Sequence, residues 1–221
     1  MSTLTAAQKW MVNSGAILAD ENGMPDNELH AFEPYDHKRV ESVNKMFSRD
    51  WGMSNKSDVL NMVDNMITGQ AGHNIDFCQT RDYWTRFTDQ QLAESLRFRS
   101  EDQQSDIKLA FTHAQTAGPN GIRSWDLGRC PSMIRNAYSL SWISEDEAWR
   151  WLHRISVELQ NSYQSWEQAG TAYIVGRLFW SKSGLSESTC DYYFGKLKRI
   201  LVNPNHAWNT VDWNTDLTKE H

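Results

Sequence analysis

The sequence predicts an all-α fold, a single compact multi-helix domain with a central buried helix. Apolar residues recur every three or four positions in many segments, which places them on one face of a helix. Helix-start patterns also recur, such as Ser144 followed by Glu147 and Ser165 followed by Gln168. Sustained alternation of polar and apolar residues, the pattern of a half-buried strand, is nearly absent.

The first half of the chain is predicted to contain short helices separated by clear loops. The first helix ends at the loop ENGMPDN, the second begins after Pro34 with Asp36 as its cap, and the third begins at the cap Ser54. AGPNG is the clearest loop in the chain. We therefore expect helices over residues 6–19, 36–51 and 54–69, and one long or two short helices over 82–117.

Helix signals are denser after the AGPNG loop. A helix is expected near Trp125, and Pro131 indicates either a kink or a later start with the proline in the first turn. The capping box at Ser144 begins a helix that carries Ala148, Leu152, Ile155 and Leu159 on one side. A last helix is expected over 187–201, before the tail HAWNTVDWN, which is expected to pack by its two tryptophans.

The central helix is predicted over SWEQAGTAYIVGRLFW, residues 165–180. Its apolar residues occupy most of the helix circumference, and Gly170 and Gly176 indicate that a backbone or an indole ring packs closely against them. A guanidinium on such a helix needs a partner when it is desolvated. We therefore expect Arg177 to pair with a carboxylate from another helix, with Asp126 and Glu167 as candidates.

These residues define a candidate polar network with an aromatic surround. Because such a set can either fix helix register or form a polar site, both interpretations stay open. The candidate network is Asp126, Arg129, Glu147, Glu167 and Arg177. The aromatic surround is Trp125, Trp149, Trp166, Tyr173 and Trp180.

Composition excludes several classes of function. The net charge of −6 argues against a general nucleic-acid partner, and the three widely separated cysteines are typical of a reducing compartment, so a cytoplasmic location is expected. The longest apolar run, residues 169–180, contains Arg177 and is too short to cross a membrane. The seven histidines show no metal-binding spacing and no phosphate-binding glycine loop is present, so no metal and no cofactor are expected.

Two classes of function remain. Eleven tryptophans and seven tyrosines favour a protein–protein interaction module, because these residues are enriched at the energetic centres of interfaces. Such a protein could mask a basic partner, as an immunity or accessory protein of a toxin or effector system would. The alternative is an enzyme that uses Asp126, Glu147 or Glu167 for acid–base chemistry, with Arg129 and Arg177 binding an anionic substrate.

Five blocks of sequence, in one order, resemble an uncharacterised bacterial family, domain-of-unknown-function 1266 (YbeU/YbeR-like proteins). The resemblance covers residues 30–213, and it implies a mainly helical bacterial domain of the cytoplasm without an established activity. We accordingly assign residues 1–29 to an N-terminal helix and loop that pack on this domain and 214–221 to a tail. Cys130-Pro131 departs from the family pattern. The blocks are SWDLGR at 124–129, WISEDEAW at 142–149, QNSYQSWEQAG at 160–170, YIVGRLFW at 173–180 and PNHAWNTVDW at 204–213.

The resemblance also implies a set of signature residues, most of which coincide with the candidate network and its surround. Carried over by position, they are Trp125, Asp126, Arg129, Glu147, Ala148, Trp149, Ser165, Trp166, Glu167, Gly170, Tyr173, Gly176, Arg177 and Trp180.

Overall fold

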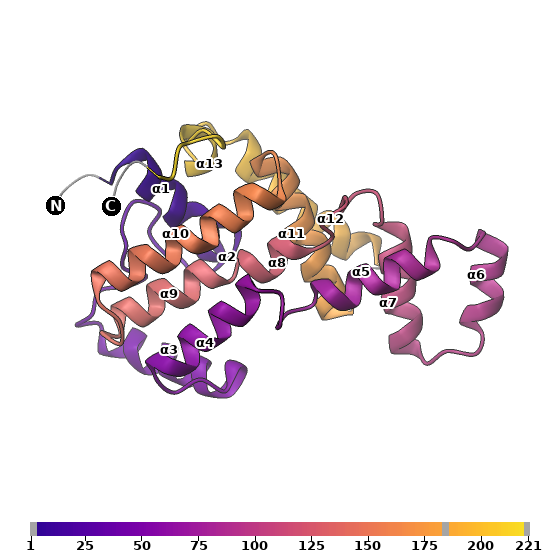
Figure 1. Cartoon of the computed structure of the whole chain (residues 1–221), viewed down its shortest axis with the longest axis horizontal. Coiled ribbons are helices and arrows are strands. Elements are labelled where there is room, and N and C mark those ends of the chain that lie inside the picture. The colour runs from indigo at the N-terminus through magenta and orange to yellow at the C-terminus, as the bar shows by residue number, and fades with distance from the viewer. Residues whose placement is uncertain (1–3, 183–185, 219–221) are drawn as a thin grey trace. The chain divides into compact units, whose positions relative to one another are not determined.

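The computed structural model describes residues 4–182 and 186–218, and every regular element within these ranges is a helix (Figure 1). The predicted all-α fold class is therefore confirmed. The chain forms two compact units. Unit 1 comprises Met1–Ala71, Leu127–Asn161 and Pro204–His221, and unit 2 comprises Gly72–Asp126 and Ser162–Asn203.

Unit 1 has a core of large side chains that are almost completely buried, including Trp10, Phe47, Ile134 and Leu152. Helix α4 packs on α9, and α1 contacts α2, α9 and α13. The helices of this unit are α1 (Ala6–Asn13), α2 (Ala16–Glu21), α3 (His37–Trp51), α4 (Lys56–Ile67), α9 (Cys130–Ser139), α10 (Glu145–Ser162, its last residue in unit 2) and α13 (Ala207–Thr210).

The first predicted helix, 6–19, is divided in the structure into α1 and α2. A capping box between Thr5 and Gln8 begins α1. The break comes at Gly15, where a Cβ atom would lie 2.5 Å from the carbonyl oxygen of Gly128. This close approach of two backbones explains why the chain leaves the helical path, and the periodicity of one segment cannot reveal it.

Several other predicted helix boundaries are confirmed. Asp36 caps α3 by accepting hydrogen bonds from the backbone N–H groups of Lys38 and Arg39. Pro131 lies in the first turn of α9, which is one of the two alternatives predicted for it. The third predicted helix begins one residue later than expected, because Asn55 rather than Ser54 is the cap of α4.

The tail packs by its two tryptophans, as predicted. The Nε1 atom of Trp208 donates a hydrogen bond to the carbonyl oxygen of Asn13 at 2.8 Å. Trp10 donates in the same way to the carbonyl oxygen of Trp213 at 3.0 Å, and the rings of these two residues are 5.3 Å apart. Residues about two hundred positions apart in the sequence therefore share the core of unit 1.

Arg135 is the most deeply buried charged residue described in unit 1, with 1% of its surface exposed. Its guanidinium donates hydrogen bonds to four backbone carbonyl oxygens of the segment before α3, those of Pro25, Glu28, Leu29 and His30. Burial lowers the pKa of Arg135 to about 10, so the side chain stays charged at neutral pH. Together with Asn13, which donates to the carbonyl oxygen of Asp26, and Ser139, which accepts from the backbone N–H of Ala31, this cation holds an irregular segment in place.

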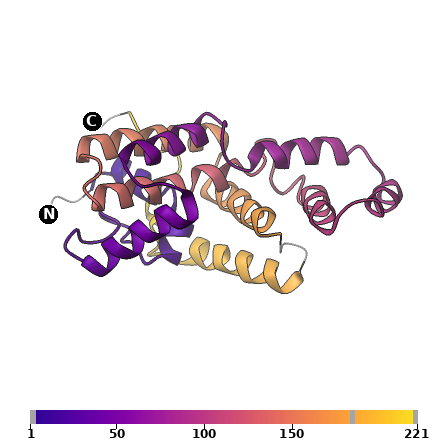
Figure 2. The ribbon, with the colours of Figure 1, turned by 90° about the horizontal axis from the view of Figure 1, so that it is seen from below.

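Unit 2 contains the helix with the most buried residues in the described chain, α11, in which ten of sixteen residues are buried. Helix α12 runs alongside α11 (Figure 2), and α7 contacts both α5 and α11. The helices of this unit are α5 (Asn74–Trp84), α6 (Asp89–Leu96), α7 (Glu101–Thr112), α8 (Arg123–Leu127, its last residue in unit 1), α11 (Trp166–Ser181) and α12 (Glu187–Val202).

The segment 82–117 was expected to form one long or two short helices. It contains the end of α5 and all of α6 and α7. These helices share a small core of Trp84, Leu92, Leu96 and Ile107. The capping boxes that begin α6 at Thr88 and α7 at Ser100 mark the missed boundaries. Each box was visible in the sequence as Ser or Thr followed three residues later by Gln.

Replacing Arg135 by Met should lower the free energy of unfolding by about 3 kcal/mol or more, because four buried carbonyl oxygens lose their donor. Urea unfolding followed by circular dichroism measures this loss. The matched control is Arg154→Met, which removes an exposed ion pair to Asp64 and should cost less than about 1 kcal/mol. Equal losses for the two variants would contradict the structural role assigned to Arg135.

Candidate functional site

The residues of the predicted polar network belong to both units. Arg129 and Glu147 lie in unit 1, whereas Asp126, Glu167 and Arg177 lie in unit 2. Glu167 is exposed in the first turn of α11. Asp126 and Arg177 are therefore the two members that the structure places in one buried region of one unit, around Trp125.

Asp126 stabilises the beginning of α5. Its carboxylate accepts hydrogen bonds from the backbone N–H of His73, at 3.0 and 3.1 Å, and from that of Asn74 at 3.0 Å. The side chain is almost completely buried, and the positive end of the helix dipole favours its charge. Gly72 has a φ of +107° and lies so close that a Cβ atom would overlap the carboxylate. The sequence Gly-His-Asn thus forms a backbone cradle for Asp126.

His73 stands beside this buried carboxylate. Its Nδ1 atom lies 3.8 Å from Oδ1 of Asp126 and makes no hydrogen bond within the described residues. Small movements of the ring would bring it into hydrogen-bond distance, and the carboxylate favours the tautomer with a proton on Nδ1. The imidazole therefore lies with Nδ1 toward the buried carboxylate.

Gly176 allows α8 to approach α11. A Cβ atom on Gly176 would lie 2.2 Å from Cβ of Trp125 and 3.2 Å from Cβ of Ile122, which no alanine could tolerate without movement. This confirms the prediction that Gly176 is a packing residue. Trp125 also packs edge-on against Tyr173, at 5.1 Å between ring centroids.

Arg177 lies over aromatic rings rather than against a carboxylate, which corrects the expected ion pair. Its Cζ atom is 4.8 Å from the ring centroid of Trp180, 5.2 Å from that of Tyr193 and 6.0 Å from that of Trp125. Within residues 4–182 and 186–218, Arg177 makes no salt bridge, and its buried Nη1 makes no hydrogen bond. Cation–π attraction explains how the cation is tolerated in a half-buried position.

Tyr192 and Lys196 extend this arrangement along α12. The ring of Tyr192 is 5.1 Å from that of Tyr193, and Nζ of Lys196 lies 4.7 Å from the Tyr192 centroid. Trp180 and Tyr192 are 48% and 55% exposed. We call Trp180, Arg177, Tyr193, Tyr192 and Lys196 the aromatic–cation surface.

The members of the predicted network in unit 1 have other contacts. The carboxylate of Glu147 accepts hydrogen bonds from Nζ of Lys56 and from the backbone N–H of Ser144, while Ser144 Oγ accepts from the backbone N–H of Glu147. The predicted capping box is thus confirmed. The Lys56 hydrogen bond, assisted by that of Ser144, lowers the pKa of Glu147 to about 2.

Arg129 and the remaining aromatic residues of the surround are placed as follows. The guanidinium of Arg129 lies 5.0 Å from the ring centroid of Trp51. Trp149 donates a hydrogen bond from Nε1 to Glu145. Trp166 is buried in the first turn of α11. The Trp149 hydrogen bond lies within α10, and Arg129 and Trp166 belong to different units.

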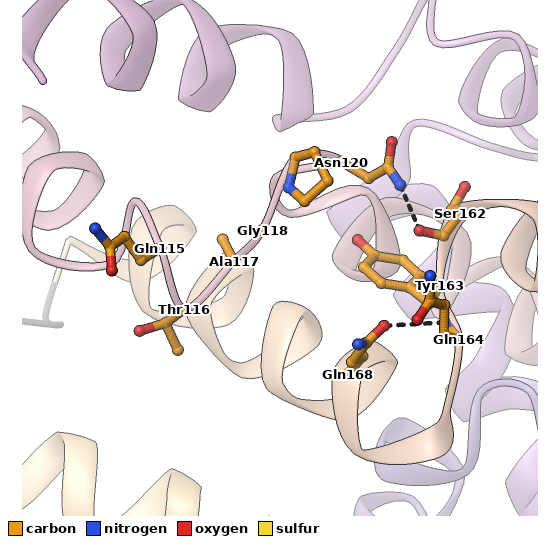
Figure 3. Close-up of a pocket in the computed structure, with 10 residues that line it drawn as sticks. Gln115, Thr116, Ala117, Gly118, Asn120, Ser162, Tyr163, Gln164 and Gln168 are labelled. Atoms are coloured by element: carbon orange, nitrogen blue, oxygen red, sulfur yellow. Dashed lines mark hydrogen bonds between the residues drawn. The ribbon is translucent and has the colours of Figure 1, made fainter.

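One cavity of unit 2, of about 240 Å3, is lined by the AGPNG loop and by residues at the start of α11 (Figure 3). Asn120 donates a hydrogen bond to the carbonyl oxygen of Ser162, and Tyr163 donates to that of Gly121 while accepting from the backbone N–H of Ser124. Burial raises the pKa of Tyr163. Since its other polar side chains are amides and hydroxyls, this cavity has no group for acid–base chemistry near neutral pH.

A second cavity of unit 2, of about 480 Å3, contains charged groups. Its walls include His73, which precedes α5, Asp76 of α5, Asp106 of α7, and Trp180 and Lys182 at the end of α11. None of the five predicted network residues lines either of these two cavities. The chemistry of this second cavity was missed in the sequence because its residues come from three separate helices.

Comparison with known proteins supports the resemblance seen in the sequence. The sequence profile of a family described as "Protein of unknown function (DUF1266)" matches residues 46–213, about three quarters of the chain. The chain belongs to this family. The matched span begins at residue 46 rather than at residue 30 as the resemblance suggested.

Two relatives from Escherichia coli (strain K12) are similar to this DUF1266 member. The uncharacterised protein YbeU is 27% identical over 143 residues, which are 64% of this chain and 60% of YbeU. The uncharacterised protein YbeR is 26% identical over 133 residues, which are 60% of this chain and 56% of YbeR. The matches thus span less than two thirds of either relative. No solved structure matches the chain.

Replacing Gly176 by Ala should destabilise this DUF1266 member by about 2 kcal/mol, because overpacking against Trp125 outweighs the better helix propensity of alanine. Gly195→Ala in α12 is the matched control. A Cβ atom there meets nothing nearer than Nη1 of Arg199 at 3.9 Å, so alanine should stabilise by up to about 1 kcal/mol. Thermal unfolding measures both effects, and equal signs would contradict the packing role.

Replacing Lys56 by Met should raise the pKa of Glu147 from about 2 toward its ordinary value of 4.5, because the main cause of the shift is removed. Carboxyl-carbon NMR titration measures the change. The stability that this carboxylate contributes in the native protein is present above pH 4.5 and is lost as the pH falls toward 2. An unchanged pKa in the variant would show that Ser144 alone holds the carboxylate in its charged form.

Proposed function

We propose that the protein acts by binding another protein, and that the aromatic–cation surface of unit 2 makes the central contacts. The observation that carries this proposal is the exposure of Trp180 and Tyr192 next to the stacked Arg177. Tryptophan, tyrosine and arginine are the residues most enriched among those that dominate binding energy at interfaces. Soluble proteins seldom leave such a group uncovered without a use for it.

The stacking of Arg177 supports the proposal energetically. A free arginine side chain loses rotamer freedom when a partner fixes it, at a cost of about 0.5–1.5 kcal/mol. Arg177 is already held between the rings of Trp180 and Tyr193, so much of this cost falls on folding rather than on binding. The surface is thus organised before a partner arrives.

The proposal of a binding surface does not depend on the total number of tryptophans. Six of the eleven are buried and serve the cores of the two units: Trp10, Trp84, Trp125, Trp166, Trp208 and Trp213. The interface argument therefore depends on the few aromatic residues that reach the surface.

The chemistry of the surface favours a partner with carboxylates around an apolar contact. Arg177 and Lys196 supply two cations beside three aromatic rings. The expectation of a basic partner depended on the excess of acidic residues in the chain. This excess lies in unit 1, which has seventeen acidic and eleven basic residues, whereas unit 2 has eleven of each. A basic partner would suit unit 1, and an acidic one suits the aromatic–cation surface.

We place this binding in the bacterial cytoplasm, in a role such as that of an immunity or accessory protein of a toxin or effector system. Cys78, Cys130 and Cys190 form no disulfide bond within the described residues, which suits a reducing compartment. The relatives are bacterial. In the described parts of the chain, no helix combines the length and the apolar character needed to cross a membrane.

The alternative, an enzyme acting on an anionic substrate through Asp126, Glu147, Glu167, Arg129 and Arg177, has less support. Asp126 is occupied with the backbone of α5, and Glu147 with Lys56 and Ser144. Arg177 lies on aromatic rings. A catalytic group needs to face its substrate, and these contacts serve structure instead.

A photoreactive amino acid placed at position 192, in the bacterium that encodes the protein, should form a stoichiometric crosslink to one protein with an acidic surface. The matched control is position 35, where Tyr35 is 74% exposed but belongs to unit 1. Trp180→Ala should abolish the crosslink from 192 without unfolding the protein. Identical crosslinking from both positions, or none from 192, would refute the proposed surface.

A further inference from the structure

The charged cavity of unit 2 is lined by residues at the beginning of α5, in α7 and at the end of α11. None of the five predicted network residues and no residue of α12 lines it, and it shares Trp180 with the aromatic–cation surface. Its volume of about 480 Å3 suits a small molecule or a single long side chain. The groups in its walls define which ligand it would accept.

The charged groups in these walls are two carboxylates and one ammonium group. Asp76 projects from the first turn of α5, and Asp106 comes from α7. Oδ2 of Asp106 pairs with Nζ of Lys182 at 2.5 Å, whereas its buried Oδ1 accepts no hydrogen bond from the described residues. Because Lys182 is about half exposed, solvent weakens this pair. Since Oδ1 is closed off from the cavity, a ligand donor reaches Asp106 by displacing Lys182 from Oδ2.

His73 adds an imidazole ring to these walls. Its Nδ1 atom faces the buried carboxylate of Asp126 at 3.8 Å. The negative charge of Asp126 behind the ring also disfavours a second anion near the cavity. An anionic ligand would thus meet the carboxylates of Asp76 and Asp106, and the one cation that the described residues contribute to the walls, Lys182, is already paired with Asp106.

Trp180 supplies an aromatic wall that is open to solvent. Its indole already carries the guanidinium of Arg177 at 4.8 Å, which shows that the ring can hold a cation. Since Trp180 also lines the cavity, a planar cation within it can contact the same side chain. Acidic acceptors beside an indole are the groups that bind a guanidinium.

We propose that this cavity binds the guanidinium group of an arginine, either the free amino acid or related amine, or an arginine side chain of a bound protein. Asp106 and Asp76 accept its N–H donors, and its plane lies against Trp180. The proposal does not require a partner on the aromatic–cation surface, because Tyr192 and Lys196 do not line the cavity.

Titration with two probes tests the proposal and separates the two sources. Nα-acetyl-arginine amide represents an arginine within a protein chain, and agmatine represents a free guanidinium compound. The expected result is saturable shifts of the His73 ring and Trp180 indole NMR signals with at least one probe at millimolar concentration. Binding of the amide alone indicates a protein side chain, binding of agmatine alone indicates a small molecule, and Nα-acetyl-norleucine amide should not bind.

Variants identify the groups responsible. Asp106→Asn should weaken binding about tenfold, and Asp76→Asn, at an exposed position that leaves folding intact, should weaken it several-fold. Asp82→Asn is the matched control, because Asp82 lies on α5, pairs with Arg81 and does not line the cavity. Tyr192→Ala should leave probe binding unchanged, which separates this test from that of the aromatic–cation surface. Absence of binding by both probes, or equal effects of Asp106→Asn and Asp82→Asn, would overturn the proposal.

Discussion

The contact between α8 and α11 at Gly176 determines how unit 2 is built. Because position 176 has no side chain, Trp125 can lie directly against the backbone of α11. This position brings Trp125 under Arg177 and next to Tyr173, and it brings Asp126, the following residue, to the backbone N–H groups of His73 and Asn74. The lack of a Cβ atom at position 176 therefore determines both the stacking of the aromatic rings and the place where α5 begins.

Two arginines illustrate two ways of stabilising a guanidinium without relying on a carboxylate contact. Arg135 is buried and donates to four carbonyl oxygens, each of which carries only a partial charge. Arg177 is half-buried and lies over ring faces. A guanidinium is weakly hydrated and has five donors on a flat surface, so carbonyl dipoles and aromatic faces can together replace a formal ion pair. Carbonyl oxygens stabilise the guanidinium where the neighbouring backbone leaves them without a donor, as around Arg135. Aromatic faces stabilise it at Arg177.

Local signals in the sequence predicted much of the fold, because helix caps and apolar stripes depend on a few adjacent residues. The capping box at Ser144, the cap at Asp36 and the place of Pro131 in a first turn are of this kind. The break at Gly15 was missed because it depends on Gly128, more than a hundred residues away.

The candidate site was less predictable for the same reason. Periodicity showed that Gly176 and Arg177 lie on a buried helix, but it could not show which residues face them. The rings of Trp180 and Tyr193 replaced the expected carboxylate. Arg135, surrounded in the sequence by Met133, Ile134 and Ala137, carried a comparable signal of burial and was not singled out. The cavity at His73, Asp76 and Asp106 left no signal, since no spacing relates these residues before the helices assemble.

The distribution of charge also limits what composition can predict. The net charge of −6 belongs to unit 1, and unit 2 has as many basic as acidic residues. Within unit 2, Trp180 has the cations Arg177 and Lys196 in the surface it helps to form, and the carboxylates of Asp76 and Asp106 in the cavity it lines. A partner that covered this tryptophan would therefore meet opposite charges within one contact area. Such an arrangement selects the orientation of a partner more strongly than its overall charge, because a rotated partner would place like charges together.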